Sequence, residues 1–258
     1  MEHTDAGVRK AVVKALGRLE PGILAQHGAA LVARLEHSDA GVREAVVKTL
    51  RKLEPGTLAQ HGAALVARLE HSDAGVRKAV VKTLGQLEPG TLAQHGAALV
   101  ARLKNSDAGV RWAVVKTLGR LEPATLAQHI AVLVARLQDS YAVVRTAVVE
   151  TLGMLEPATL AQHGAALVAM LEDSAWGVRW AVVMTLRKLE PTTLALHGAA
   201  LVARLKDEDA RVRWAVVKTL EKLEPATLAL HRAALVAMLQ DSEAFVHDAV
   251  VNTLEKLD

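Results

Sequence analysis

A unit of 34 residues recurs along the whole chain, and this period limits the possible folds more than any other feature. The prolines make it visible, because each stands 34 residues after the one before it. They are Pro21, Pro55, Pro89, Pro123, Pro157, Pro191 and Pro225. Fixed periods of about 20 to 50 residues are typical of stacked repeats, in which each unit leaves an apolar face for its neighbour to cover. Such an array grows by contact between neighbours, so we expect one continuous domain over residues 1–258.

Each repeat contains two apolar patterns with the spacing of an α-helix. In the second repeat one pattern comprises Val42, Ala45, Val46, Leu50 and Leu53, and the other comprises Leu58, Leu65, Val66 and Leu69. We therefore predict a B helix over 39–53 and an A helix over 55–69, joined by a two-residue corner. The Asp39 side chain can accept hydrogen bonds from the first amides of the B helix, and Pro55 suits the first turn of the A helix. The whole chain then contains eight B helices and seven A helices.

The composition limits which residues can form the core and excludes several kinds of functional site. Hydrophobic residues make up 51% of the chain but aromatic residues only 2%, so the core must consist of Ala, Val and Leu. The chain has no cysteine, which excludes disulfides, thiolate metal sites and cysteine nucleophiles. No stretch reaches the ~18 apolar residues of a membrane span, so we expect a cytoplasmic protein with no membrane partner.

The stretch 73–85, Asp-Ala-Gly-Val-Arg-Lys-Ala-Val-Val-Lys-Thr-Leu-Gly, closely resembles the D-x-x-V-R-x-A-x-x-x-L-G signature of HEAT-like repeats of the phycobilisome-lyase type. The resemblance extends to engineered consensus HEAT-like scaffolds and covers the whole chain. It implies an all-α protein, an α-solenoid superhelix with B helices on the concave side and A helices on the convex side. It also implies that the Asp and Arg of the signature tie adjacent repeats together, here Asp39, Asp73, Arg43 and Arg77. Departures from the signature occur at Tyr141, Ala175, Glu243 and His247.

A column of histidines is the most conspicuous candidate for chemistry. It comprises His27, His61, His95, His129, His163, His197 and His231. Packed helices lie about 8–10 Å apart, whereas zinc requires its ligands ~2 Å from one centre, so one histidine per repeat cannot share an ion. We interpret the column as structural and expect no metal, no cofactor and no catalytic residue. The family name alone suggests an enzyme such as a bilin lyase, but no set of residues supports that activity.

The columns that vary between repeats point away from the predicted core of the B helix. All six aromatic residues lie at the start of B helices, where other repeats carry Lys, Asp, Ala or Gly. From these columns we predict a protein-binding surface formed by Trp112, Tyr141, Met154, Trp176, Trp180, Met184, Arg211, Trp214 and Phe245. The predicted function is non-catalytic binding of a protein or peptide on the concave face. The alternative for the aromatic residues is that they fill gaps between neighbouring B helices.

Two other functions stay open. The outward column of Lys14, Lys48, Lys82 and Lys116 could bind a polyanion, although the net charge of only +3 does not favour nucleic acid as the partner. Alternatively, uncapped ends could support weak head-to-tail self-association, as in a structural, self-assembling array. Near-identical repeats that vary at surface columns are also what an engineered repeat protein would show.

Overall fold

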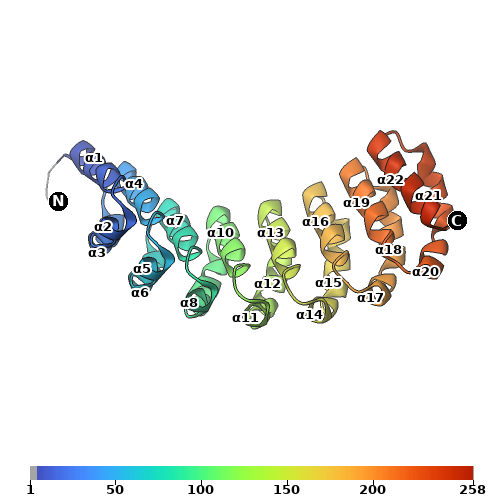
Figure 1. Ribbon diagram of the computed structural model, residues 1–258, viewed down its shortest axis with the longest axis horizontal. Helices are drawn as coiled ribbons and strands as arrows, with labels where there is room; N and C mark the ends of the chain where they lie inside the picture. Colours follow the sequence, from blue (N-terminus) through green and yellow to red (C-terminus); the bar gives the residue numbers. More distant parts are fainter. Residues whose placement is uncertain (1–4, 258) are drawn as a thin grey trace. The chain divides into compact units, whose positions relative to one another are not determined.

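The computed structural model describes residues 5–257, and every regular element in that range is an α-helix or a 3-10 helix. The residues divide into two compact units, unit 1 (Met1–His129) and unit 2 (Ile130–Asp258). Within each unit the B-type helices lie side by side in one row and the A-type segments in a second row (Figure 1). The predicted fold class, an all-α solenoid of HEAT-like helix pairs, is confirmed. One continuous domain over the full chain stays a prediction.

In unit 1 the four B-type helices are α1 (Ala6–Leu16), α4 (Ala40–Leu50), α7 (Ala74–Leu84) and α10 (Ala108–Leu118). The A-type segments contain α2 (Pro21–Ala25), α3 (Gly28–Ala33), α5 (Pro55–Ala59), α6 (Gly62–Ala67), α8 (Pro89–Ala93), α9 (Gly96–Ala101) and α11 (Pro123–Ala127). Short 3-10 helices η1 (Arg34–Glu36), η2 (Arg68–Glu70) and η3 (Arg102–Lys104) lead into the next B helix.

Unit 2 repeats this order, with B-type helices α13 (Ala142–Leu152), α16 (Trp176–Leu186), α19 (Ala210–Leu220) and α22 (Ala244–Leu254). Its A-type segments contain α12 (Ile130–Val134), α14 (Pro157–Ala161), α15 (Gly164–Ala169), α17 (Pro191–Ala195), α18 (Gly198–Ala203), α20 (Pro225–Ala229) and α21 (Arg232–Ala237). The 3-10 helices are η4 (Ala135–Gln138), η5 (Met170–Glu172), η6 (Arg204–Lys206), η7 (Met238–Gln240) and η8 (Glu255–Leu257).

The A segment is not the single helix that the apolar spacing predicted. In the second repeat α5 ends at Ala59, and α6 begins only at Gly62. Between them His61 has φ −104° and ψ 4°, and its amide donates to the Leu58 carbonyl three residues back. The chain therefore makes one tight turn and changes direction at the histidine. Periodicity missed this break because the apolar residues on both sides of it still reach the same core.

The B helix begins as predicted and ends early. Asp39 is its N-cap, and the Asp39 carboxylate accepts a 2.8 Å hydrogen bond from the Val42 amide. The helix ends at Leu50, so residues 51–54 connect it to Pro55 at the start of α5, and the predicted two-residue corner is wrong. Glu54 is extended, as the residue before a proline prefers to be.

The core consists of the predicted Val, Leu and Ala residues, and a buried threonine joins it in most B-type helices. Val42, Val46 and Leu50 are fully buried, whereas the predicted core residue Val66 is only half-buried. Thr49 is buried beside them, and its hydroxyl lies 2.9 Å from the Ala45 carbonyl and 3.2 Å from the Val13 carbonyl of the preceding B helix. Hydrogen bonding therefore lets this threonine pack between two helices without an unsatisfied polar group. Within residues 5–257 no helix is long and apolar enough to cross a membrane.

Candidate binding surface

The outward side of the B-type helices, which we call the B face, contains several columns of residues that vary between repeats. In unit 1 this face is basic. Lys14, Lys48 and Lys82 of the predicted column are exposed, and Lys116 is half-buried. Helices present these positions outward because the valines and leucines on the opposite side of each helix form the core.

Two grooves cross the B face of unit 1. The groove between α4 and α7 has a volume of about 570 Å³ and contains Val47, Val76 and Ala79 among its lining residues. The groove between α1 and α4 has a volume of about 400 Å³. Lys48 and Glu44 line both grooves, because α4 forms a wall of each. Each groove therefore combines an apolar part with charged walls.

The electrostatics of these grooves favour negative charge. Lys48 Nζ lies 2.7 Å from the Glu44 carboxylate. This hydrogen bond, together with the positive charges of Lys48, Lys10 and Lys14, holds the pKa of Glu44 below its usual value. Lys52 donates from Nζ to the Gly17 carbonyl at 2.6 Å and so bridges α4 to the end of α1. The largest cause of this lowered pKa is the Lys48 hydrogen bond, and the charges of Lys10 and Lys14 add to it.

Trp112 does not project freely from the B face. It is half-buried on α10, and the ammonium groups of Lys78 and Lys82 on α7 lie 5.9 Å and 5.3 Å from its ring centroid. These are cation–π distances, so the indole fills the space between two B helices and draws two lysines toward it. The binding role of Trp112 stays a prediction, and these two contacts are also what the gap-filling alternative expects.

In unit 2 the predicted aromatic residues divide into two groups. Trp180, Met184 and Trp214 are half-buried along the middle of their helices. Tyr141, Trp176 and Phe245, at or near helix starts, are more exposed, and so is Met154, just after the end of α13. The helix wheel could not separate the groups, because it predicts direction but not how closely the next helix approaches.

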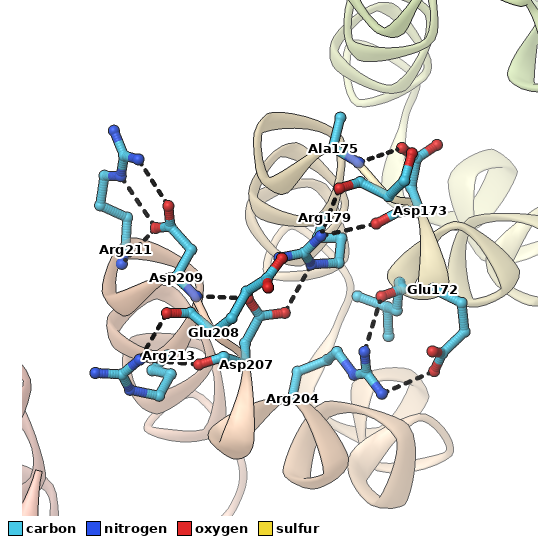
Figure 2. A network of polar contacts seen from close by, with 12 residues as sticks. Glu172, Asp173, Ala175, Arg179, Arg204, Asp207, Glu208, Asp209, Arg211 and Arg213 are labelled. Carbon is cyan, nitrogen blue, oxygen red and sulfur yellow. Dashed lines mark hydrogen bonds and ion pairs between the residues drawn. The ribbon is translucent and has the colours of Figure 1, made fainter.

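Trp176 and Arg211 form the best-defined contact of this surface. The guanidinium carbon of Arg211 on α19 lies 3.4 Å from the centroid of the Trp176 ring on α16. Arg211 is oriented by Asp209, whose carboxylate accepts its Nη2 at 2.7 Å and its Nε at 3.0 Å (Figure 2). The tryptophan keeps 41% of its surface exposed. Other repeats carry Ala and, in most cases, Gly at these two positions.

An Arg–Asp ladder connects successive repeats of unit 2 and corrects one inference from the resemblance. Arg179 donates from Nε and Nη2 to the two carboxylate oxygens of Asp207, both at 2.7 Å (Figure 2). Arg145 pairs with Asp173 and Arg213 with Asp241 in the same way. These acceptors stand two residues before the N-cap position, where the resemblance placed the Asp.

The same acceptors also stabilise the turn that starts each B helix. Asp173, for example, accepts the Ala175 amide at 2.8 Å. In unit 1 the equivalent positions hold His37, His71 and Asn105, which accept the same backbone amide but offer no second carboxylate oxygen. In unit 2 this column, two residues before the N-cap, changes to Asp. At the N-cap itself, Tyr141, Ala175 and Glu243 replace the Asp. These two changes together are the sequence signal that could have identified the ladder.

Unit 1 confirms the inferred tie in one repeat and contradicts it in another. Arg43 forms an ion pair with Asp73, the N-cap of the following B helix. Arg77 instead approaches Asn105, with Nη2 3.4 Å from the amide oxygen. Asp39 acts as an N-cap. Because the Arg77 contact is long and its acceptor is neutral, the tie between these two repeats is weaker.

The histidine column has a packing role between repeats. Five of its imidazoles lie against the glycine that begins the second half of the preceding A segment. They are those of His61, His95, His129, His197 and His231. Burial lowers the pKa of His197, which favours a neutral ring. Among residues 5–257 no cluster of three or more His, Asp or Glu side chains could hold a metal ion.

Sequence reasoning missed two exposed leucines on the A-type segments. Leu196 and Leu230 are each 80% exposed. They replace the glutamine that the five preceding repeats carry at this column, and that break in the column was the available signal.

Comparison with known proteins supports the repeat assignment. A family model described as HEAT repeats matches residues 62–153, and a model described as a HEAT repeat associated with sister chromatid cohesion matches residues 199–220. The X-ray structure of YibA from Escherichia coli superimposes with a TM-score of 0.61 and 13% identity, over 100% of this chain and 99% of that one. The crystal structure of an engineered protein gives 0.58 and 15%, over 78% and 96%. No curated protein matches the sequence.

The solved structures share the fold of this chain, and the family model identifies the type of repeat. The unit matched at residues 62–153 recurs with the same 34-residue period on both sides of that match. Each copy forms the same helix pair. The chain is therefore a HEAT-like repeat protein, an all-α repeat scaffold.

Proposed function

We propose that this scaffold binds a protein or peptide on its B face and performs no catalysis. The stacked pair of Trp176 and Arg211 carries the proposal. Both residues depart from the composition of most other repeats, and Asp209 holds the arginine in place before any partner arrives. Trp, Tyr and Arg are the residues that most often dominate binding energy at protein interfaces.

Preorganisation strengthens this interpretation. An exposed arginine normally loses rotamer freedom when it binds, whereas Arg211 already has a fixed orientation from two hydrogen bonds and a ring contact. Tyr141 and Phe245 also place aromatic surface at the starts of B-type helices, with exposed fractions of 56% and 43%. The pair of Trp176 and Arg211 can therefore bind without a large ordering cost.

The experiment is a selection of displayed random peptides against the full chain, followed by affinity measurements on a variant. Tyr141→Asp, Trp176→Ala and Phe245→Gly together restore the residues of the other repeats and should leave the fold intact. We expect the selected peptides to lose about 30-fold or more in affinity, since an anchor residue is typically worth about 2 kcal/mol.

Leu196→Gln with Leu230→Gln is the matched control, because it also replaces exposed apolar residues by those of other repeats, but on the A-type segments. This control should bind the selected peptides as the unchanged chain does. Equal affinity of the aromatic variant would refute the assignment of the surface, and a selection that yields no binding peptide would refute the proposed function.

A further inference from the structure

The B face of unit 1 differs in chemistry from the surface that Tyr141, Trp176, Arg211 and Phe245 form in unit 2. Its two grooves are lined by cations from three successive B-type helices and from the segments that follow α1 and α4. The main ones are Lys10, Lys14, Lys48, Arg51, Lys78 and Lys82. Two acidic residues also line them, Glu44 and Asp73, and each is paired, with Lys48 and Arg43 respectively. Both acids are thus already neutralised by partners, and an excess of positive charge faces the grooves.

We infer that these two grooves bind an extended acidic peptide, whose carboxylates lie against the lysines and whose aliphatic parts contact Val47 and Ala79. This inference rests on the proposed peptide-binding function and names the partner class for unit 1. The lowered pKa of Glu44 agrees with it in part: its largest cause is the Lys48 hydrogen bond, and Lys10 and Lys14, which also lower it, line the same groove.

The arrangement favours a peptide over a single-stranded nucleic acid. Proteins that bind single strands combine cations with open aromatic rings on which bases stack. Trp112 is the only aromatic residue in the sequence of unit 1, and the ammonium groups of Lys78 and Lys82 lie over its ring. The B face of unit 1 therefore offers charge without a stacking platform.

The spacing of the helices suggests the form of the peptide. Packed helices are about 8–10 Å apart, and a polyproline II chain advances about 9 Å over the three residues of one turn. Acidic residues at every third position of such a chain would meet successive grooves on the same side. This conformation is also largely formed before binding, which reduces the entropy lost on association.

The test uses the full chain and a fluorescein-labelled peptide of four Glu-Pro-Pro units, with four Gln-Pro-Pro units as the neutral match. Fluorescence polarisation at low ionic strength should show at least tenfold tighter binding of the acidic peptide, and added salt should remove the difference. Lys14→Gln with Lys48→Gln should weaken acidic binding about tenfold, at roughly threefold per exposed cation.

Lys104→Gln with Lys206→Gln is the matched control, because it removes two exposed lysines outside the grooves. It should change the affinity less than twofold, and circular dichroism should show that both variants keep their helices. Equal binding of the acidic and neutral peptides would overturn the inference while leaving the proposed function intact. Tighter binding of a single-stranded thymidine dodecamer than of the acidic peptide would assign the grooves to nucleic acid and also overturn it. If library peptides fail to bind as well, the proposed function fails.

Discussion

His95 Nε2 lies 2.5 Å from the point that a Cβ on Gly62 of the preceding repeat would occupy. The same relationship joins Gly28 to His61 and Gly164 to His197. The glycine therefore makes room for the imidazole of the next repeat. Ile130 stands in this column without such an opening, and there the helix is one residue shorter and the following 3-10 helix one residue longer than in most repeats.

This contact predicts opposite effects for alanine at two helical glycines. Gly62→Ala places a methyl group against the ring of His95, and we expect a loss of about 1–2 kcal/mol in the free energy of unfolding, as for other overpacked sites. Gly56→Ala meets no atom within 4 Å and should stabilise the protein by about 0.5–1 kcal/mol through helix propensity. Urea denaturation measures both, and a stabilising Gly62→Ala would disprove the packing role of the histidine.

The Arg–Asp ladder predicts that losing an arginine destabilises unit 2 more than unit 1. Arg179→Met leaves the buried Asp207 carboxylate without its bidentate partner, so we expect a loss of about 3–5 kcal/mol in stability. Arg77→Met removes one long contact to neutral Asn105 and should cost about 1–2 kcal/mol. Both arginines also donate to two backbone carbonyls, so the difference reports the carboxylate contacts of Arg179, namely Asp207 and, at 3.2 Å, the exposed Glu208. Equal losses in urea denaturation would contradict this explanation.

Asn105→Asp should give Arg77 in unit 1 the kind of carboxylate partner that the arginines of the ladder have in unit 2. Among the described residues Arg77 Nε is buried and has no hydrogen-bond partner, and an aspartate at 105 would offer it a second oxygen. Because charged hydrogen bonds are stronger, we expect a gain of about 1–2 kcal/mol. Asn252→Asp on the exposed side of α22 is the control and should change stability by less than about 0.5 kcal/mol. If Asn105→Asp brought no gain in stability, the amide of Asn105 would already serve Arg77 as well as a carboxylate does.

Acid should destabilise unit 2 by protonating the aspartates of the Arg–Asp ladder. The hydrogen bonds from Arg213 hold the pKa of Asp241 below its ordinary value, although burial opposes this. The folded state therefore binds fewer protons than the unfolded state. The stabilisation is complete above the ordinary aspartate pKa of about 3.9 and disappears as the pH falls through the lower folded value. Asp241→Asn should flatten the decline in urea midpoint over this range, and an unchanged slope would place the acid sensitivity elsewhere.

The sequence alone determined the helix-pair architecture. A period of 34 residues with a proline in each copy places the start of every A segment, and the spacing of Val42, Val46 and Leu50 identifies the buried side of the B helix. Such inferences are local, because helical geometry converts sequence spacing directly into direction. The Asp39 cap followed from the same local chemistry.

Only the tertiary structure decided how neighbouring repeats meet. The packing of His61 against Gly28 and the pairing of Arg179 with Asp207 join side chains and backbone about one repeat apart. The same dependence separates covered Trp112 from exposed Trp176, although both lie on the outward side of a B-type helix. Periodicity contains no information about the distance or offset between two packed helices. That distance decides whether an outward side chain fills a gap or stays available to a partner.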